Sequence, residues 1–379
     1  MSPTPTSMSD PRVPASYSWE ATNEEVARRY GLPVEQVVRF DLNTSPAPPA
    51  SVARLLATGR FELGLSEYPP SDYRRLTAAA ALAYAVPTDE ILVEAGADEI
   101  LDLAAKAFLG EGERAVIPTP SYAMYRVLTE QRRAEVVAVP RHGPESARAL
   151  DRPALRAAAR TAAVVWLCNP NNPTGRLEPE GLIDDLLADL AADAVADGRE
   201  APVVVLDEAY SEFVGRSLVG LRAGYPRLVV VRTASKAYAL AGLRVGFAIA
   251  RRETLARIEP YRPPGSVSTV SVSIATEILG ERDVLAANLA RVETERARLA
   301  EALWAAGWRP EPSVTNFLLV PFDDPETAAT VADTLLKEGL VPRTFPADHP
   351  LAHCLRLTVR DVAEDDRLIA AAQRAGGTR

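Results

Sequence analysis

The feature that most constrains the fold is a series of short, uninterrupted apolar runs, three of which end in polar residues. These three are "AAVVWLCNP" (162–170), "APVVVLDEAY" (201–210) and "RLVVVRTASK" (227–236). Uninterrupted rather than alternating hydrophobicity is typical of strands that helices cover on both faces. Similar runs, with helical patterns between several of them, occur at 90–96, 114–122, 135–140 and 244–250. The pattern predicts an α/β fold with a mostly parallel central sheet.

The pattern changes after about residue 270. A long helical pattern, interrupted near Gly280, leads into short strand patterns and two further helical ones. This arrangement predicts a smaller α+β domain beside the large one. The expected division of the chain is a loose tail at 1–16, a segment at 17–65 that contributes to the small domain, a large domain at 66–270 and a small C-terminal domain at 271–379.

Composition excludes several classes of partner. The formal net charge is −9 and no long run of one sign occurs, which argues against nucleic acid or an anionic membrane surface as a partner. The first segment, "MSPTPTSMSDPRVPAS", lacks the apolar core of a signal peptide, and no uncharged apolar run has the length of a membrane span. The chain has two cysteines and three histidines, so we expect no disulfide framework and no metal site, and a cytoplasmic location. We interpret His349, His353 and Cys354 as structural residues.

Polar residues follow the predicted strands where each strand ends. Asn169 to Gly175, Asp207 to Tyr210 and Thr233 to Lys236 stand at such ends. Ligands in open α/β sheets lie at the carboxyl ends of the parallel strands, so these groups should converge on one site. The turn "EAGADE" (94–99) opens a helix whose first N–H groups, at Ala97 and Asp98, have no internal partner and suit a phosphate.

The expected site combines a lysine, a strand-end aspartate, a tyrosine three residues later and a phosphate cradle. Pyridoxal 5′-phosphate needs these groups. Its aldehyde reacts with an amine, its pyridine nitrogen pairs with an acidic side chain, and its phosphate binds several hydrogen-bond donors. The sequence therefore predicts this cofactor, held by Lys236.

Six motifs in order, "GADE", "PSYAMY", "NPNNPTG", "DEAY", "RTASKAYALAGLRVGF" and "LRLTV", resemble the fold-type-I aminotransferases. Within them the similarity to histidinol-phosphate aminotransferases is greatest, and it extends from about residue 17 to about 375. The resemblance implies a three-layer, aminotransferase-like large domain. It also implies amino-group transfer between glutamate or 2-oxoglutarate and histidinol phosphate or imidazole-acetol phosphate, a step of histidine biosynthesis.

The resemblance implies roles for the cofactor-binding residues. Lys236 would bind the aldehyde and move the proton, and Asp207 would pair with the pyridine nitrogen. Tyr210 and Asn172 would hydrogen-bond the phenolic oxygen, and Tyr122 would stack on the ring.

Five further residues would bind the cofactor's phosphate. Ser235 and Arg244 would do so together with the amides of Ala97 and Asp98. Tyr68 would reach the phosphate from a partner subunit, so a homodimer with shared active sites is implied.

We expect Gly242 and Gly246 to permit close approach of backbone segments.

The resemblance also implies substrate-binding residues. Arg356 would hold the α-carboxylate, for which a guanidinium is suited in shape and charge. Arg343, thirteen residues earlier, would meet a substrate phosphate, with Tyr17 near the same group, and Asn172 is a further expected substrate contact. The alternative for Arg343 is a solvated charge on an exposed strand.

One departure keeps other functions open. The family commonly reads Asn-Glu-Asn-Pro where this chain has "LNTSP" (42–46), so Asn43 and Pro46 match while the acidic residue is absent. An aminotransferase for aromatic or other amino acids, or a threonine-phosphate-type decarboxylase, is therefore an alternative. A non-catalytic regulator built on this fold is a third hypothesis, but it would need a DNA-binding segment ahead of residue 17.

Overall fold

The computed structural model describes residues 16–59 and 64–375. The tail expected at 1–16 lies outside these residues except for Ser16. Within the described part of the chain, no helix combines the length and the apolar character that a membrane crossing requires.

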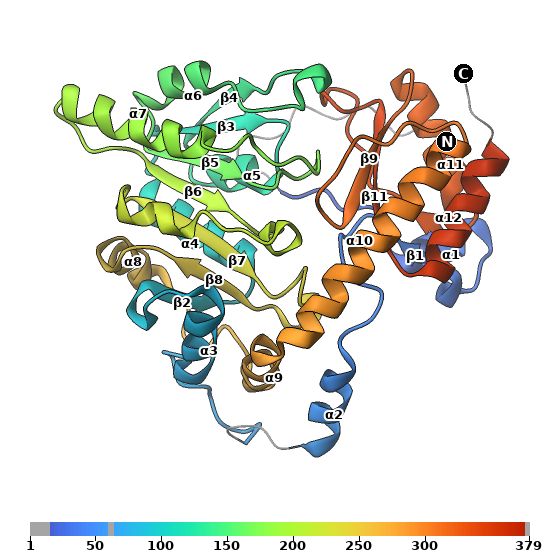
Figure 1. The fold of residues 1–379 in the computed structure, drawn as a ribbon, viewed down its shortest axis with the longest axis horizontal. Coiled ribbons are helices and arrows are strands. Elements are labelled where there is room, and N and C mark those ends of the chain that lie inside the picture. The colour runs from blue at the N-terminus through green and yellow to red at the C-terminus, as the bar shows by residue number, and fades with distance from the viewer. Residues whose placement is uncertain (1–15, 60–63, 376–379) are drawn as a thin grey trace.

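A seven-stranded sheet forms the centre of the larger part of the molecule (Figure 1). Its strand order is β2-β8-β7-β6-β5-β3-β4, and β8 alone runs in the direction opposite to the other six strands. The strands are β2 (Ile91–Glu94), β3 (Arg114–Thr119), β4 (Glu135–Pro140), β5 (Val164–Cys168), β6 (Val203–Asp207), β7 (Leu228–Thr233) and β8 (Gly246–Ile249). The prediction of an α/β fold with a mostly parallel sheet is confirmed.

The two faces of this sheet bury separate hydrophobic clusters, which explains the uninterrupted apolar runs. Alternate residues of each strand point to opposite faces. Val165 and Leu167 pack on one side, whereas Val164 and Trp166 pack on the other. The first face is covered by α3 (Arg74–Tyr84), α6 (Arg152–Ala159), α7 (Leu182–Ala196) and α9 (Thr269–Gly280), the second by α4 (Ala97–Phe108), α5 (Met124–Gln131) and α8 (Arg252–Ile258). Helix, sheet and helix thus form three layers.

The smaller part of the molecule has its own core. Its strands are β9 (Phe317–Pro321), paired antiparallel with β11 (Cys354–Thr358), and β1 (Val38–Arg39), paired parallel with β10 (Leu340–Val341). The helices α10 (Arg282–Ala305), α11 (Pro325–Lys337) and α12 (Val362–Ala375) surround a cluster that contains Leu299, Leu318 and Leu357. The β1–β10 pair links the N-terminal segment to this part.

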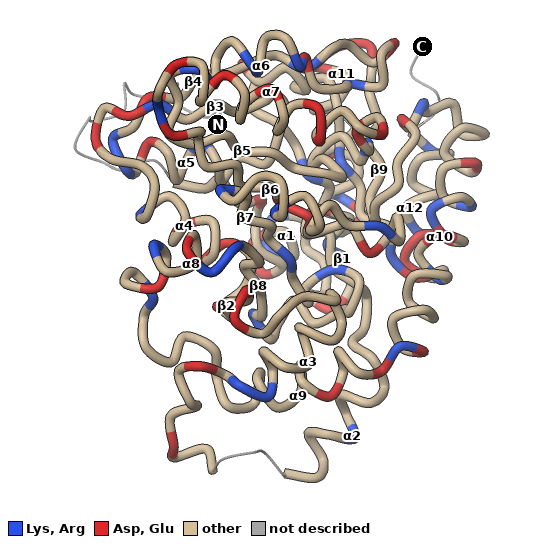
Figure 2. Tube along the Cα trace, turned by 60° about the vertical axis from the view of Figure 1, so that its left-hand side comes forward, with Lys and Arg blue, Asp and Glu red and all other residues tan. Residues whose placement is uncertain are grey.

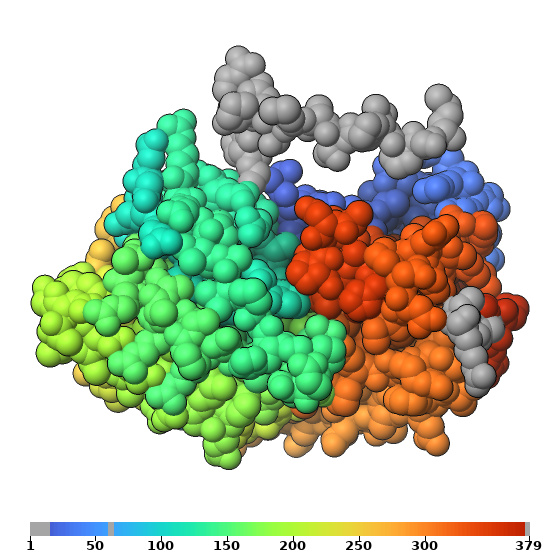
Figure 3. Space-filling model, turned by 90° about the horizontal axis from the view of Figure 1, so that it is seen from above, coloured from blue at the N-terminus to red at the C-terminus, as the bar shows by residue number. Residues whose placement is uncertain are grey.

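The two parts pack directly against each other, and Figure 3 shows the contact between the green and the orange segments. Arg148 forms an ion pair with Glu311 across this contact, and both side chains are about nine-tenths buried. Helix α9 and Val52 of α2 (Ala50–Thr58) belong to the core of the large sheet. The domain boundaries after residues 65 and 270 stay predictions.

Acidic and basic residues are interspersed along the elements rather than gathered by sign (Figure 2). One regular arrangement joins α6 to α7. Arginines recur at every fourth position along α6, and each forms an ion pair with an aspartate that recurs at every fourth position along α7. Arg152 pairs with Asp189 at 2.7 Å and Arg156 with Asp193 at 2.8 Å, and Arg160 pairs with Asp197. This Arg–Asp ladder (Arg152, Arg156, Arg160 with Asp185, Asp189, Asp193, Asp197) holds the two helices in register.

Candidate active site

A cavity of about 460 Å³ lies where the parallel strands of the large sheet end against the smaller part. All predicted site residues except Tyr68 line it: Tyr17, Ala97, Asp98, Tyr122, Asn172, Asp207, Tyr210, Ser235, Lys236, Arg244, Arg343 and Arg356. The expected convergence of the strand-end groups is therefore present. Tyr68 is 89% exposed and does not line this cavity.

The turn before α4 forms one end of the cavity. Gly96 has φ +89°, a conformation that suits glycine, and the helix begins at the next residue. Arg244 crosses over this turn, since a Cβ on Gly96 would lie 2.5 Å from its Nη2 atom. The unpaired N–H groups at the helix start and this guanidinium make the turn a binding site for an anion.

Two predictions for glycines near this turn had different outcomes. A Cβ on Gly246 would lie 2.4 Å from the carbonyl carbon of Gly96, so the expected close backbone approach is confirmed there. A Cβ on Gly242 would meet no atom within 4 Å among the described residues, so the same prediction for Gly242 is wrong. Gly242 belongs to a short 3₁₀ turn, Ala241–Leu243, beside which the chain leaves open space.

Lys236 lies in the site and has no acidic hydrogen-bond partner within residues 16–59 and 64–375. Its Nζ donates to the carbonyl oxygens of Leu42 (3.3 Å) and Asn43 (3.2 Å). Burial, assisted by the Arg356 cation, lowers the pKa of the amine to about 8. A sizeable fraction of the amine is therefore neutral and nucleophilic near physiological pH.

Asp207 ends β6 and is buried, with one protein donor on each carboxylate oxygen. The hydroxyl of Tyr125 donates to Oδ2 at 2.8 Å, and the Ala209 N–H donates to Oδ1 at 3.0 Å. Burial raises the pKa of the carboxyl to about 6, and these two donors oppose the rise. The group remains an anion at neutral pH, suited to pair with a cationic nitrogen.

Three further predicted residues have defined partners in the wall. The Tyr210 hydroxyl accepts from Asn43 Nδ2 at 2.9 Å, and burial raises the pKa of the phenol. The Tyr122 hydroxyl donates to Asp98 Oδ1 at 3.0 Å. Asn172 accepts from Arg356 Nη1 at 2.5 Å, a contact that joins the two parts of the molecule.

Arg356 and Arg343 lie opposite each other on adjacent backbone segments, which exchange two hydrogen bonds of 3.0 Å. Arg356 is buried and donates to the Asp41 carbonyl at 2.5 Å, yet its Nε atom is buried with no hydrogen-bond partner among the described residues. Burial lowers its pKa, and the Arg343 cation adds to this effect. The Arg343 side chain is 14% exposed, so the alternative of a solvated surface charge is wrong.

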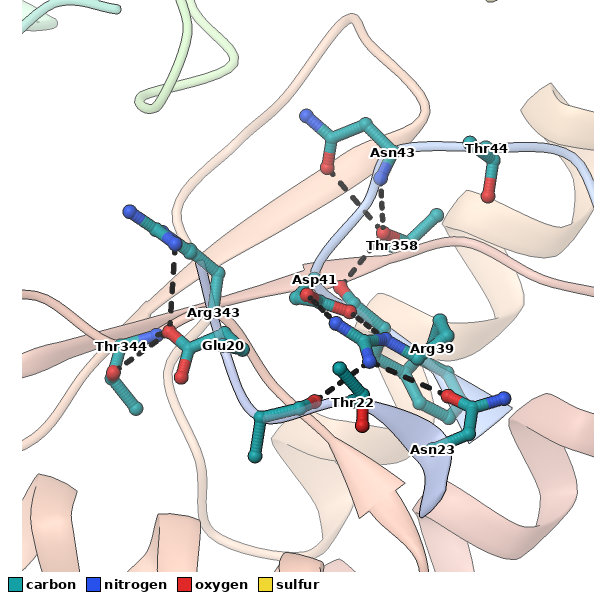
Figure 4. A network of polar contacts seen from close by, with 12 residues as sticks. Glu20, Thr22, Asn23, Arg39, Asp41, Asn43, Thr44, Arg343, Thr344 and Thr358 are labelled. Carbon is teal, nitrogen blue, oxygen red and sulfur yellow. Dashed lines mark hydrogen bonds and ion pairs between the residues drawn. The ribbon is translucent and has the colours of Figure 1, made fainter. Parts of the chain in front are cut away.

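Sequence reasoning missed several residues that line the cavity, and four of them are polar or aromatic. Trp19, Asp41 and Thr44 were not assigned to the site, and Asn43 was matched only as part of a motif. Asn43 donates to the Tyr210 hydroxyl and also contacts Thr358, and Figure 4 shows the second of these contacts. The signal that was available is the segment "DLNTSP" itself, whose polar residues interrupt an otherwise apolar context.

His349 and Cys354 have local structural surroundings. The Nδ1 atom of His349 accepts from the Leu351 N–H at 3.1 Å, and its ring stacks on Phe345 with centroids 4.9 Å apart. Cys354 is buried and its thiol is free. These contacts agree with the interpretation of both residues as structural.

Comparison with known proteins matches this site to a family. The model of the family described as aminotransferase class I and II matches residues 45–371. The chain belongs to this family. The aminotransferase is 36% identical over 360 residues to histidinol-phosphate aminotransferase of Symbiobacterium thermophilum, covering 93% of this chain and 94% of that one. It is 38% identical over 306 residues to the protein of the same name from Xanthomonas euvesicatoria, covering 78% and 81%.

Solved structures of related proteins have the same fold as this aminotransferase. The crystal structure of histidinol-phosphate aminotransferase from Sinorhizobium meliloti in complex with pyridoxal-5′-phosphate has a TM-score of 0.83 at 25% identity, covering 95% of both chains. L-threonine-O-3-phosphate decarboxylase from Porphyromonas gingivalis has a TM-score of 0.74 at 25% identity, covering 89% of this chain and 99% of that one.

Proposed function

We propose that this aminotransferase binds pyridoxal phosphate and transfers an amino group between glutamate or 2-oxoglutarate and histidinol phosphate or imidazole-acetol phosphate, in histidine biosynthesis. The observation that carries this proposal is the pair Arg343 and Arg356, two cations on facing backbone segments in the wall of the cavity that contains Lys236. They suit substrates with anionic groups. The curated relatives carry the corresponding name over most of the chain.

The residues of the cavity fit the cofactor. An amine with a depressed pKa, a buried carboxylate with one donor on each oxygen and a cradle of helix N–H groups beside a guanidinium match its aldehyde, ring nitrogen and phosphate. The buried Arg356 Nε without a partner among the described residues agrees with a further anionic ligand.

In the proposed mechanism the bound cofactor supplies an aldehyde and an electron-withdrawing ring, which stabilises negative charge at the substrate carbon. Lys236 would hold the aldehyde through its Nζ, and the same Nζ, when free and neutral, would take the proton from the substrate carbon. Asp207 keeps a proton on the ring nitrogen by remaining an anion.

The other proposed roles concern binding and orientation. Arg356 holds the carboxylate of glutamate, and Arg343, with Tyr17 beside it, holds the distal anionic group, so that the reacting carbon faces Lys236. Tyr210 and Asn172 hydrogen-bond the phenolic oxygen of the cofactor, and Tyr122 stacks on its ring. Ser235 and Arg244 bind its phosphate with the amides of Ala97 and Asp98.

The proposal includes a homodimer in the cytoplasm. The 89% exposure of Tyr68 supports a role in a partner's site, since a tyrosine this exposed has room to reach another subunit. Two free, buried cysteines agree with a reducing compartment.

A decarboxylase for threonine phosphate is the second candidate, favoured by the structural similarity to the Porphyromonas gingivalis enzyme. One experiment separates the two. The holoenzyme is titrated in single turnovers with histidinol phosphate, glutamate, phenylalanine and threonine phosphate, while the visible absorption of the cofactor and the release of carbon dioxide are followed. Conversion by histidinol phosphate and glutamate without carbon dioxide supports the proposal, and silence with histidinol phosphate contradicts it.

A further inference from the structure

The segment Tyr17–Glu20, here called the N-terminal strap, holds a carboxylate beside Arg343. Glu20 Oε1 accepts two hydrogen bonds from Thr344, one from its backbone N–H and one from its hydroxyl, both of 2.8 Å (Figure 4). The same oxygen lies 3.7 Å from Arg343 Nη1. Because two donors hold this oxygen, the negative charge has a fixed position next to the cation.

The strap also fixes Arg343 itself. Arg343 Nη1 donates to the Ser18 carbonyl at 2.8 Å, and its guanidinium carbon lies 5.2 Å from the centroid of the Tyr17 ring. The side chains of Arg343 and Glu20 are only 14% and 20% exposed. Solvent therefore screens this pair less than it screens an exposed one, and the charge of Glu20 acts on any anion that binds at Arg343.

We infer that Glu20 is a specificity-determining residue whose carboxylate weakens the binding of every anion at Arg343, and weakens a phosphate dianion more than a carboxylate. The Coulomb energy between two groups is proportional to the product of their charges. A phosphate ester carries a charge of roughly −1.5 to −2 at neutral pH, so the repulsion from Glu20 is close to double that felt by a carboxylate.

As a consequence, Glu20 reduces the difference between the affinity of Arg343 for a phosphate and its affinity for a carboxylate. This inference rests on the proposed function, in which one pocket receives glutamate and a phosphorylated substrate in alternation. If no carboxylate lay beside Arg343, the two cations Arg343 and Arg356 would bind a phosphate more tightly than a carboxylate, and the phosphate would occupy the pocket. Glu20 thus places a negative charge beside Arg343 in a chain that lacks the acidic residue expected in the segment "LNTSP".

The test is equilibrium dialysis of the holoenzyme at pH 8 against labelled inorganic phosphate or labelled acetate. Under the proposed function the cofactor's own phosphate would occupy the cradle at Gly96 in the holoenzyme, so the added anions would report on the arginines. The variant is Glu20→Gln, which keeps the size of the side chain and an oxygen for Thr344. The matched control is Glu24→Gln, an exposed glutamate on α1 (Asn23–Tyr30).

We expect Glu20→Gln to tighten acetate binding about three-fold and phosphate binding about ten-fold, and Glu24→Gln to change neither. Thr344→Val, which keeps the charge and the backbone N–H, should preserve the wild-type ratio of the two affinities. Equal changes for both anions, weaker binding of both, or no saturable binding to any variant would overturn the inference. Reactivity toward histidinol phosphate does not enter this measurement, so its outcome is separate from that of the proposed function.

Discussion

The hydroxyl of Tyr125 lies 2.8 Å from Oδ2 of Asp207 and donates a hydrogen bond to it. Tyr125 is fully buried, and its ring stacks on Trp166 with an interplanar angle of 4°. The stack fixes the ring, and the ring fixes the hydroxyl on the carboxylate. Tyr125 is therefore a positioning residue for the group that we propose to face the cofactor nitrogen.

Replacing Tyr125 with phenylalanine should move the acidic limb of the pH–activity profile to higher pH. The hydrogen bond favours the ionised carboxylate, so its loss raises the pKa of Asp207 further above about 6. We also expect a loss of stability of about 1–3 kcal/mol, because a buried acceptor loses its donor. Tyr225→Phe, which removes a buried 2.7 Å hydrogen bond to the Pro202 carbonyl far from the cavity, is the control. If both variants leave the acidic limb in place, Tyr125 has no role in tuning Asp207.

Gly246→Ala should lower the affinity for the cofactor and destabilise the fold by about 1–3 kcal/mol. The added Cβ would lie 2.4 Å from backbone of Gly96 and 2.7 Å from the Ala97 nitrogen, so the phosphate cradle has to shift. Gly242→Ala, where a Cβ meets nothing within 4 Å among the described residues, should leave both quantities near wild type. Cofactor dissociation constants and thermal melts measure the contrast, and equal behaviour of the two variants contradicts the proposed cradle.

The rate at which the apo-protein captures pyridoxal phosphate covalently should follow the titration of Lys236. Only the neutral amine attacks the aldehyde, and burial lowers the pKa of this amine to about 8. The rate is expected to rise with pH up to about 8 and to level off above it. Arg356→Gln removes a cation that lowers this pKa, so its plateau should begin at higher pH. A wild-type rate that still rises beyond pH 10 would contradict the assignment.

The double variant Asp189→Asn with Asp193→Asn should melt at a lower temperature than the wild type at pH 6. Hydrogen bonds from Arg152 and Arg156 lower the pKa values of these two carboxyls. Since the folded pKa lies below the ordinary value of 3.8, the contribution is present above that pH and is lost as the pH falls through the folded pKa.

Differential scanning calorimetry from pH 7 to pH 3 checks this prediction. The difference in melting temperature should shrink at the acidic end and in 1 M salt, because the Arg–Asp ladder is partly exposed. Asp184→Asn, an exposed residue on the same helix, is the control. A difference that does not depend on pH would mean that packing rather than charge joins α6 to α7.

The sheet and the centre of the site could be predicted because their signals are local. A strand buried on both faces needs an uninterrupted apolar run, and the groups that follow it project from one edge of the sheet. Cys168, Asp207 and Thr233 each end such a run, and the structure ends β5, β6 and β7 on them. The hydrogen-bond partners of Asp207 could not be predicted from local patterns, although its partner Tyr125 lies in the motif "PSYAMY" (120–125).

The contacts of the N-terminal strap and the core into which α9 packs could not be predicted from local sequence signals. Glu20 and Thr344 are 324 positions apart and Asn43 and Tyr210 are 167 apart, so nothing near either residue indicates its partner. Helical periodicity likewise marks which face of α9 is apolar without saying which core receives it. Hydrophobic patterning specifies elements and their buried faces because it repeats over a few residues. Which polar side chains from distant loops meet, and how burial then shifts their charges, depends on how the packed elements bring those loops together.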